Sequence, residues 1–494
     1  MSRIRLLLLL ISLHLPGVLF ANFDFNSNCQ NAYRSVFELK LGNAKAYINT
    51  EKKVHPGNSL IPLLENYVDY FTLLTSNSKA DFDRLKSNKS IRLDKISEGD
   101  KASPYYLFAQ AEINLQWALI RSRYGEFFNA AMEIRRANNM LKDNAKKFPD
   151  FLLNLKGLGL INAVLGNLPD GTLKTALATF GFKGNMQSGL DMFEKLAVEL
   201  PKSDYGAFYN ETVFYYLYVL TDVAHDDSAF SKTMKYTERI ADTSLLKSYL
   251  KAYVCVKTGH SEDAISILNH KPKGNVYQPY PYLDYLEGIA RLNKLDPAAE
   301  ACFNRFLQSS KGTDYIKDAN LHLGWLSLIN GDKAGYNAYI SKTKTSGFTY
   351  CERDKQALNE AGDETPDLTL LKARLLSDGG YLVKAEQVLT GKNINSFSTQ
   401  KDKTEFYYRQ ARIKDALNQF DSALACYQQT INIGKSLKYY FAANSALQMG
   451  KIYEQKQNTA KAKASYTLAI SMKNHQYESS IENEAKAALK RLKD

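Results

Sequence analysis

The chain has 494 residues and a formal net charge of +12 at pH 7, from 64 Lys and Arg against 52 Asp and Glu. This length exceeds what one compact hydrophobic core usually holds, so several domains or an extended array of repeats are expected. Apolar residues form 45% of the sequence, which excludes a mostly disordered chain. Basic and acidic residues are interspersed, so the charge predicts a solvated surface and not a nucleic-acid-binding one; attraction to an anionic lipid or glycan is the alternative.

Residues 1–21 have the pattern of a secretory signal peptide. Arg3 and Arg5 precede the leucine-rich run 6–13, and Ala21 ends a plausible cleavage site. The run is shorter than the roughly 20 residues that cross a bilayer, which disfavours the alternative of a membrane anchor. No cysteine follows the cleavage site directly, so a bacterial lipid anchor is not expected. We therefore expect an exported protein, in the periplasm or cell envelope of a bacterium or secreted.

The rest of the chain has helical periodicity. Phe127, Ala130, Ile134 and Leu141, for example, recur at spacings that place them on one face of a helix. No convincing run of alternating apolar and polar residues predicts a strand. The sequence therefore predicts an all-α protein.

A small residue followed four positions later by an aromatic recurs along the sequence. Successive small residues lie 35 to 39 positions apart over much of the chain, as at Ala229, Ala264, Ala299 and Ala334, and at Ala385, Ala423 and Ala462. In the stretch 180–201, Gly184 is expected in a turn between two helices, Gly189 at the small position and Phe193 at the aromatic one. A small residue is needed where two helices cross closely, because a larger side chain would force their axes apart.

This pattern resembles the tetratricopeptide repeat. In residues 446–470, Gly450, Tyr453, Ala462, Tyr466 and Ala469 match the repeat's preferred positions. The resemblance implies a right-handed superhelical solenoid of helical hairpins, each burying its apolar face against its neighbours. The expected organisation is a signal peptide (1–21), an N-terminal helical segment (22–100), helical repeats with an inserted apolar helix (101–205), central repeats (206–345), a loop (346–366), and C-terminal repeats with a capping helix (367–494).

Residues 105–201 have a closer resemblance. The stretches GLGLINAVLGNLPDG (157–171) and GFKGNMQSGL (181–190) are similar to eukaryotic tetratricopeptide proteins of the mitochondrial outer membrane and inclusion-body-clearance type. This resemblance implies a non-enzymatic interaction protein near membranes or lipid, but the predicted signal peptide departs from it, so the location of those proteins is not transferred. The apolar stretch 157–168 is too short to span a bilayer and is interpreted as a core helix; a helix on a membrane surface is the alternative.

The sequence lacks a recognisable catalytic or metal-binding motif. None of the seven histidines pairs with another at metal-ligand spacing, and His225-Asp226-Asp227 is interpreted as a helix cap. Glu112, Glu126 and Glu133 could act in acid–base chemistry, but nothing in the sequence marks them as buried together. We therefore predict no enzyme and no catalytic, cofactor-binding or metal-binding residue.

The five cysteines do not form a disulfide pattern, because their number is odd and no CxxC motif occurs. Cys255, Cys302 and Cys426 are expected to be packed thiols. A single disulfide is the alternative, with no pair indicated by the spacing.

Two groups of aromatic residues need a structural explanation. Phe214, Tyr215 and Tyr218 are interpreted as part of a packed helix. Tyr277, Tyr280 and Tyr282 lie in a proline-broken segment. They are expected to fix this segment onto the next helix, with stacking on a sugar ring or contact with a peptide as the alternative.

These observations predict an exported tetratricopeptide-type scaffold that binds a protein or peptide in its concave groove, with peripheral membrane contact left open and no nucleic-acid partner. The first alternative is a glycan- or nutrient-binding helical protein of the outer-membrane uptake type. The second is an enzyme with a site between helices, which a buried cluster of acids or histidines would indicate.

Overall fold

The computed structural model describes residues 22–166, 175, 177 and 184–492, and this part of the chain is helical with no β-strand. The predicted signal peptide lies outside the described residues, as does part of the motif at 157–190. In the N-terminal part the helices are α2 (Ser27–Phe37), α3 (Leu41–Val54), α4 (Ile61–Ser76), α5 (Lys79–Leu85), α6 (Asn88–Ser97), α7 (Pro104–Arg123), α8 (Phe127–Lys147) and α9 (Asn154–Gly166).

The central and C-terminal parts continue in the same way. Their helices are α11 (Met186–Glu199), α12 (Tyr209–Tyr218), α13 (Ala229–Thr237), α14 (Leu245–Lys257), α15 (Ser261–Asn269), α16 (Tyr282–Asn293), α17 (Ala299–Ser309), α18 (Ile316–Ile329), α19 (Lys333–Thr345), α20 (Glu352–Gly362), α21 (Leu368–Asp378), α22 (Leu382–Leu389), α23 (Gln400–Ala416), α24 (Phe420–Gly434), α25 (Phe441–Gln455), α26 (Thr459–Ser471) and α27 (Glu478–Arg491).

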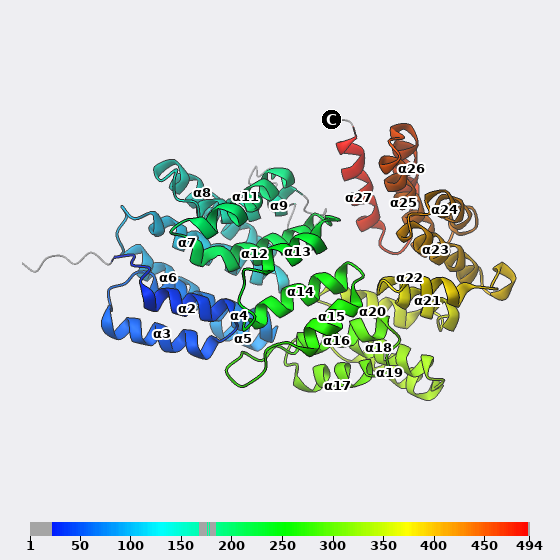
Figure 1. The fold of residues 1–494 in the computed structure, drawn as a ribbon, viewed down its shortest axis with the longest axis horizontal. Coiled ribbons are helices and arrows are strands. Elements are labelled where there is room, and N and C mark those ends of the chain that lie inside the picture. Colours follow the sequence, from blue (N-terminus) through cyan, green and yellow to red (C-terminus); the bar gives the residue numbers. More distant parts are fainter. Residues whose placement is uncertain (1–21, 167–174, 176, 178–183, 493–494) are drawn as a thin grey trace, which may run out of the picture.

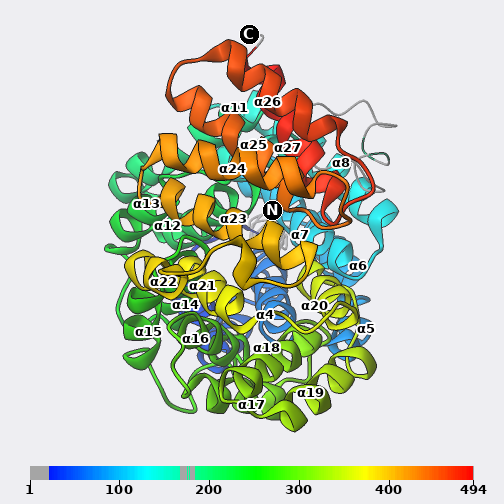
Figure 2. The same cartoon turned by 90° about the vertical axis from the view of Figure 1, so that its right-hand side faces the viewer.

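Consecutive helices pack as hairpins, and the hairpins follow one another in a curved stack (Figure 1). The most extensive contacts within hairpins join α2 with α3, α7 with α8, α9 with α11, α16 with α17, α18 with α19, α23 with α24, and α25 with α26. Figure 2 shows the C-terminal helices, in yellow, orange and red, from the end of the stack. The prediction of an all-α solenoid of tetratricopeptide-like hairpins is confirmed.

Small residues lie where the helices cross closely. A Cβ atom on Gly189 of α11 would lie 2.6 Å from the carbonyl oxygen of Gly159 on α9, and Phe193 is fully buried one turn later. The positions Ala264, Ala299, Ala385, Ala423 and Ala462 are likewise fully buried. The small-residue prediction therefore holds across most of the repeats.

Ala334 is an exception to this pattern. It is exposed on α19, and Tyr336 is the buried residue of this part of the helix. Gly324 on α18 faces the side chains of Tyr336, Tyr339 and Ile340, so the face of α19 that packs on α18 is not the face that carries Ala334. Ala334 lies 35 residues after Ala299 but is not buried at the crossing of two helices. The prediction that Ala334 is the small buried residue of its repeat was wrong.

The N-terminal helices pack against helices of the central repeats. The backbone N–H of Gln278 donates to the carbonyl of Leu39 at 2.7 Å, and the Ser244 hydroxyl donates to the carbonyl of Phe37 at 2.9 Å. One hydrophobic core extends from Phe23 through the first half of the chain to Leu286. Residues 22–100 therefore form an integral part of the first half of the protein.

Two expected segments can be compared directly with the structure. The region 346–366, predicted to be a loop, contains the 11-residue helix α20. The apolar stretch beginning at Gly157 lies in α9, where Leu160, Ile161 and Ala163 are buried against neighbouring helices, as expected of a core helix. In the described part of the chain, no helix combines the length and apolar character needed to cross a membrane.

Candidate functional site

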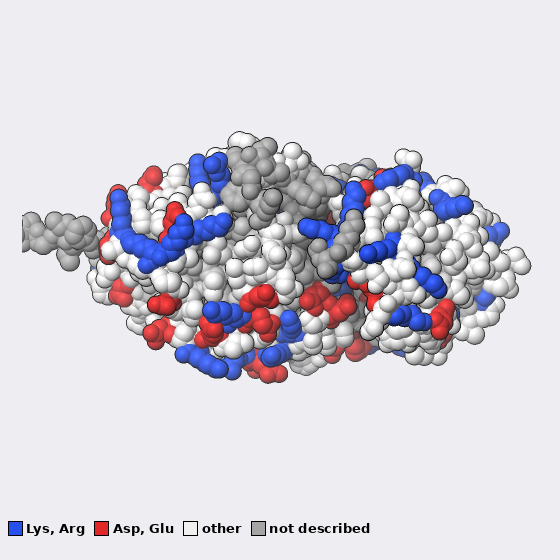
Figure 3. Space-filling model, turned by 90° about the horizontal axis from the view of Figure 1, so that it is seen from above, with Lys and Arg blue, Asp and Glu red and all other residues white. Residues whose placement is uncertain are grey.

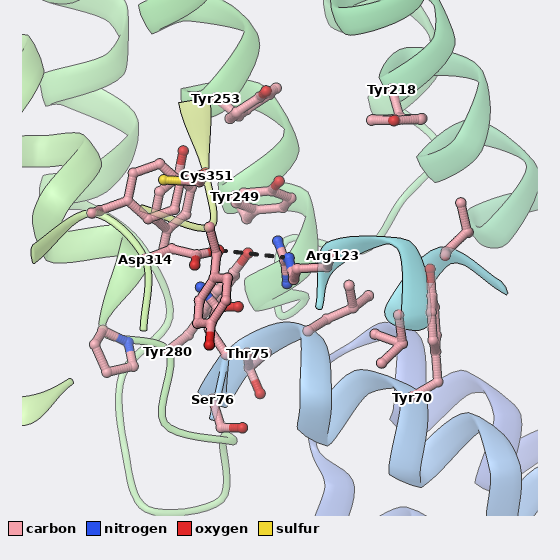
Figure 4. Close-up of a pocket in the computed structure, with 18 of the residues that line it drawn as sticks. Tyr70, Thr75, Ser76, Arg123, Tyr218, Tyr249, Tyr253, Tyr280, Asp314 and Cys351 are labelled. Carbon is pink, nitrogen blue, oxygen red and sulfur yellow. Dashed lines mark ion pairs between the residues drawn. The ribbon is translucent and has the colours of Figure 1, made fainter. Parts of the chain in front are cut away.

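A cavity of about 580 Å³ lies where the N-terminal helices meet the central repeats (Figure 4). Its wall is formed by the ends of α4 and α7, by α12 and α14, and by the segments that precede α16, α18 and α20. Among the described residues, nine tyrosines line it: Tyr70, Tyr215, Tyr218, Tyr249, Tyr253, Tyr280, Tyr282, Tyr315 and Tyr350. We call this space the tyrosine cavity.

The tyrosine cavity depends on a contact between distant parts of the chain. The backbone N–H of Thr313 donates to the carbonyl of Asn77, just after α4, at 3.1 Å. A Cβ atom at the neighbouring Gly312 would lie 2.9 Å from the carbonyl oxygen of Ser76, so glycine permits this close approach. The contact brings Asp314 and Tyr315 to the end of α4.

The three tyrosines of the proline-broken segment have different roles. Tyr277 fixes the segment, because its hydroxyl donates to the carbonyl of Thr243 at 2.8 Å. Tyr280 and Tyr282 line the cavity, and the ring of Tyr249 lies 5.2 Å from that of Tyr280. The expected fixing role therefore holds for Tyr277, while Tyr280 and Tyr282 both pack on neighbouring tyrosine rings and line the cavity.

Charged groups also line the tyrosine cavity. Nε of Arg123 lies 3.8 Å from a carboxylate oxygen of Asp314. Oδ1 of Asp222 accepts a 2.6 Å hydrogen bond from the Tyr253 hydroxyl and lies 3.1 Å from the ammonium group of Lys257. Within the described residues, three buried atoms of the lining have no hydrogen-bond partner: Asn77 Oδ1, Arg123 Nη1 and Asp222 Oδ2.

The backbone is irregular at two positions of the cavity wall. Val219–Val223 forms a π-helical turn, and this turn carries Asp222. Tyr315 has a left-handed backbone conformation with φ of 68° immediately before α18. Such irregularities are enriched at functional sites, because they cost stability and persist where they position a side chain.

Burial keeps the cavity tyrosines protonated. It raises the pKa of Tyr249, Tyr253 and Tyr282 well above the ordinary value of 10, and that of Tyr315 to about 12. Each hydroxyl can therefore donate and accept hydrogen bonds at neutral pH. Burial also raises the pKa of the Cys351 thiol, which disfavours the reactive thiolate.

A second candidate surface lies on the C-terminal repeats. Within the described chain, its lining includes side chains of α21, α23 and α25, the first helices of their hairpins, and none from α22, α24 or α26. The charged and aromatic members are Trp325, Tyr336, Glu360, Asp363, Glu364, Arg374, Lys401, Glu405, Arg409, Tyr439, Tyr440, Phe441 and Tyr477. We call this surface the C-terminal groove.

An acidic segment of the same chain, which includes Glu360 and Asp363, forms part of the wall of the C-terminal groove. Glu360 of α20 accepts hydrogen bonds of 2.9 and 3.1 Å from the two terminal nitrogens of Arg374. Asp363 accepts hydrogen bonds from Lys438 at 2.8 Å and from Gln476 at 3.0 Å. The guanidinium of Arg374 also lies over the ring of Trp325, 5.0 Å from its centre. The carboxylates of Glu360, at the end of α20, and Asp363, just after it, are thus held by basic and amide side chains of the C-terminal repeats.

Comparisons with known proteins support the repeat assignment at this end of the chain. Residues 404–433 and 443–476 match the tetratricopeptide repeat family, and these ranges contain most of the α23–α24 and α25–α26 hairpins. The C-terminal part of the chain carries tetratricopeptide repeats. The resemblance of residues 105–201 to the mitochondrial outer-membrane and inclusion-body-clearance type stays a prediction.

Among solved structures, the chain is similar to the crystal structure of the APC/C hetero-tetramer Cut9-Hcn1. The match has 10% sequence identity and a TM-score of 0.27, and it covers 94% of this chain and 96% of that chain. No match was found among curated proteins.

A buried charge cluster joins several of the N-terminal helices. The ammonium group of Lys156 lies 2.7 Å from a carboxylate oxygen of Glu112 and pairs also with Glu211. The hydroxyls of Tyr33 and Tyr67 donate to Glu211, the latter at 2.9 Å. Little in the sequence indicates this cluster. Its one signal is the charged residue Lys156 directly before the apolar stretch of α9.

This cluster is the kind of feature that would indicate an enzyme. However, the side chains of Glu112, Lys156 and Glu211 are at most 2% exposed, and none of them lines the tyrosine cavity. Glu133 and Glu126 do not join it, because both pair with Arg121. The cluster therefore holds helices together and offers a substrate no access in this conformation.

The remaining polar predictions agree with structural roles. Asp226 accepts a 2.7 Å hydrogen bond from the backbone N–H of Ser228, as expected for a cap near the start of α13. All five cysteines are unpaired thiols, and Cys255 and Cys302 are buried. On the face seen in Figure 3, basic and acidic side chains lie close together, in agreement with an interspersed charge.

Proposed function

We propose that this protein is an exported scaffold of the bacterial cell envelope that binds a protein or peptide partner through the C-terminal groove. The observation that carries the proposal is the binding of two carboxylates at this groove, those of Glu360 by Arg374 and of Asp363 by Lys438. Tetratricopeptide hairpins commonly present preformed grooves to peptides. In this proposal no side chain is catalytic, and no cofactor or metal takes part.

The contacts of the acidic segment indicate the chemistry of the partner. Arg374 binds a carboxylate through both terminal nitrogens, a geometry that favours Asp or Glu side chains. Tyr440 and Phe441 supply aromatic surface beside it. We therefore expect an acidic peptide segment that displaces residues 360–363.

A labelled peptide with the sequence of residues 357–367 tests the groove directly. In the wild-type protein the intramolecular segment competes with it, whereas the double variant Glu360→Gln, Asp363→Asn weakens the competitor. We expect the double variant to bind the peptide at least tenfold more tightly in a fluorescence-anisotropy titration. Glu352→Gln is the matched control, because Glu352 is 68% exposed on the same helix, pairs with Lys355 and does not line the groove. Equal binding by all three proteins, or none, would contradict the proposal.

The location is tested by expressing the whole chain in a Gram-negative bacterium. We expect mature protein in the periplasmic fraction, with an N-terminus at Asn22 by mass spectrometry. Unprocessed protein in the cytoplasm would contradict export. Capture with the mature protein from envelope extract, lost on adding the 357–367 peptide, would identify candidate partners.

The tyrosine cavity favours a second function, the binding of a glycan or nutrient. Its aromatic lining and unpaired polar atoms suit a small ligand that has both apolar faces and hydroxyl groups. A glycan array with the wild type and Tyr282→Ala separates the two functions. Binding that requires Tyr282 supports the second function, and absence of any glycan binding leaves the scaffold function alone.

A further inference from the structure

We propose that the tyrosine cavity binds a short neutral saccharide. This inference rests on the second function above, glycan binding, and specifies the class of ligand. The volume of about 580 Å³ lies within the range of roughly 300 to 1,000 Å³ typical of small-molecule sites. The cavity is therefore large enough for a small ligand or the end of a longer chain.

The aromatic rings provide flat apolar surfaces. The rings of Tyr249, Tyr280 and Tyr282 are tilted by 35° to 59° relative to one another, so these three do not stack in parallel, whereas one face of Tyr282 stacks on the ring of Tyr285 at 5.4 Å. Figure 4 shows Tyr249, Tyr280 and Arg123 around the same region of the cavity. The C–H face of a sugar ring can pack on such a tyrosine while the phenolic hydroxyl bonds to a sugar hydroxyl.

The unpaired polar atoms require a ligand with donors and acceptors. Nη1 of Arg123 is a donor, whereas Oδ2 of Asp222 and Oδ1 of Asn77 are acceptors. A sugar hydroxyl both donates and accepts a hydrogen bond, so it can pair with either kind of atom. A purely apolar ligand would leave these buried atoms without partners, which is unfavourable.

The charged side chains that line the cavity are in ion pairs. Arg123 lies beside Asp314, and Asp222 lies beside Lys257, which is outside the lining, so the two charges of each pair offset one another. A site for a phosphate or carboxylate would require excess positive charge, and a site for an ammonium group would require excess negative charge. The balance favours a neutral ligand.

The inference is tested by isothermal titration calorimetry with residues 22–494. The probes are neutral di- and trisaccharides of glucose, galactose, mannose and N-acetylglucosamine, together with uronic acid and amino-sugar oligomers and an uncharged blocked tripeptide. We expect at least one neutral saccharide to bind, and Tyr280→Ala and Asp222→Ala each to weaken that binding at least tenfold. Tyr47→Ala is the matched control, because Tyr47 is 38% exposed on α3 and does not line the cavity.

A cooperative thermal unfolding transition establishes that each variant is folded. If Tyr280→Ala or Asp222→Ala does not fold, Arg123→Met replaces it as a variant of a residue that lines the cavity. Preferential binding of a charged sugar through the cavity would overturn the inference and leave the glycan function standing. Absence of saccharide binding, or binding only of the tripeptide, would overturn both. Neutral-saccharide binding that none of the lining variants weakens would place the ligand elsewhere and also overturn the inference.

Discussion

Gly288 on α16 faces the ring of Phe303 on α17, and a Cβ atom at residue 288 would lie 2.8 Å from that ring. The ring is fully buried, so it has little room to move away. The same relationship, a small residue on the first helix against an aromatic on the second, occurs between Gly450 and Tyr466. It sets how closely the two helices of a hairpin approach.

We expect Gly288→Ala to lower stability by about 1 to 3 kcal/mol through overpacking, despite the better helix propensity of alanine. The midpoint of urea unfolding measures this effect. Gly42→Ala is the control, since no atom lies within 4 Å of a Cβ at this helical position. There alanine is expected to raise the stability slightly, by up to about 1 kcal/mol. A loss of stability at both positions would argue against the packing explanation.

Local sequence patterns predicted the hairpins because each hairpin depends on residues close in sequence. Gly189 and Phe193, for instance, are four residues apart, so both lie on one face of α11 and their burial can be predicted from the local sequence. The assignment failed at Ala334, where spacing alone cannot reveal which face of α19 is buried. Periodicity indicates that a segment is helical, but the packing of neighbouring helices determines which face of that helix is buried.

The candidate sites were less predictable because they depend on contacts between distant residues. The sequence indicates Tyr280 and Tyr282 as candidate ligand-binding residues. Arg123 and Asp222, which line the same cavity, lie far from them in the sequence and come close only because α4 and α7 pack against the central repeats. Similarly, the segment 346–366 has no repeat pattern that would predict its contacts. Its residues Glu360 and Asp363 bind Arg374 and Lys438, which come later in the sequence.

The buried thiols give a prediction about chemical modification. Burial raises the pKa of Cys29 and of Cys255 to about 12, so both are thiols at pH 8. We expect iodoacetamide to leave these two residues unmodified in the native protein and to label them in denaturant. Peptide mass spectrometry locates the label. Rapid labelling of Cys29 or Cys255 in the folded protein would show that its surroundings open to solvent.

Removal of Lys156 is expected to destabilise the N-terminal half strongly. Lys156 is the cation between Glu112 and Glu211, so Lys156→Met leaves two buried carboxyl groups without their charged partner. Breaking such a buried arrangement costs about 3 to 5 kcal/mol, measured as a shift in urea unfolding. Lys195→Met is the control, because Lys195 is 53% exposed and its closest carboxylate is 4.0 Å away. Its effect should stay within about 0.5 kcal/mol.

Glu112 should make the stability depend on pH in a direction opposite to that of most carboxyl groups. Burial and then the nearby Glu211 raise the pKa of Glu112 from its ordinary value of 4.5 to about 7, although Lys156 acts against this change. The folded protein therefore holds this proton more tightly than the unfolded chain does. The resulting stabilisation is complete below about pH 4.5 and is lost as the pH rises to about 7.

The variant Glu112→Gln isolates this contribution, because glutamine does not titrate and the other ionisable groups remain in both proteins. Between pH 4.5 and 7.5, we expect the stability of the wild type to fall relative to that of the variant, by up to about 3 kcal/mol. Urea unfolding at a series of pH values measures the difference. A difference that stays constant with pH would mean that Glu112 titrates alike in the folded and unfolded chains, and a difference of opposite sign would mean that Lys156 dominates over burial.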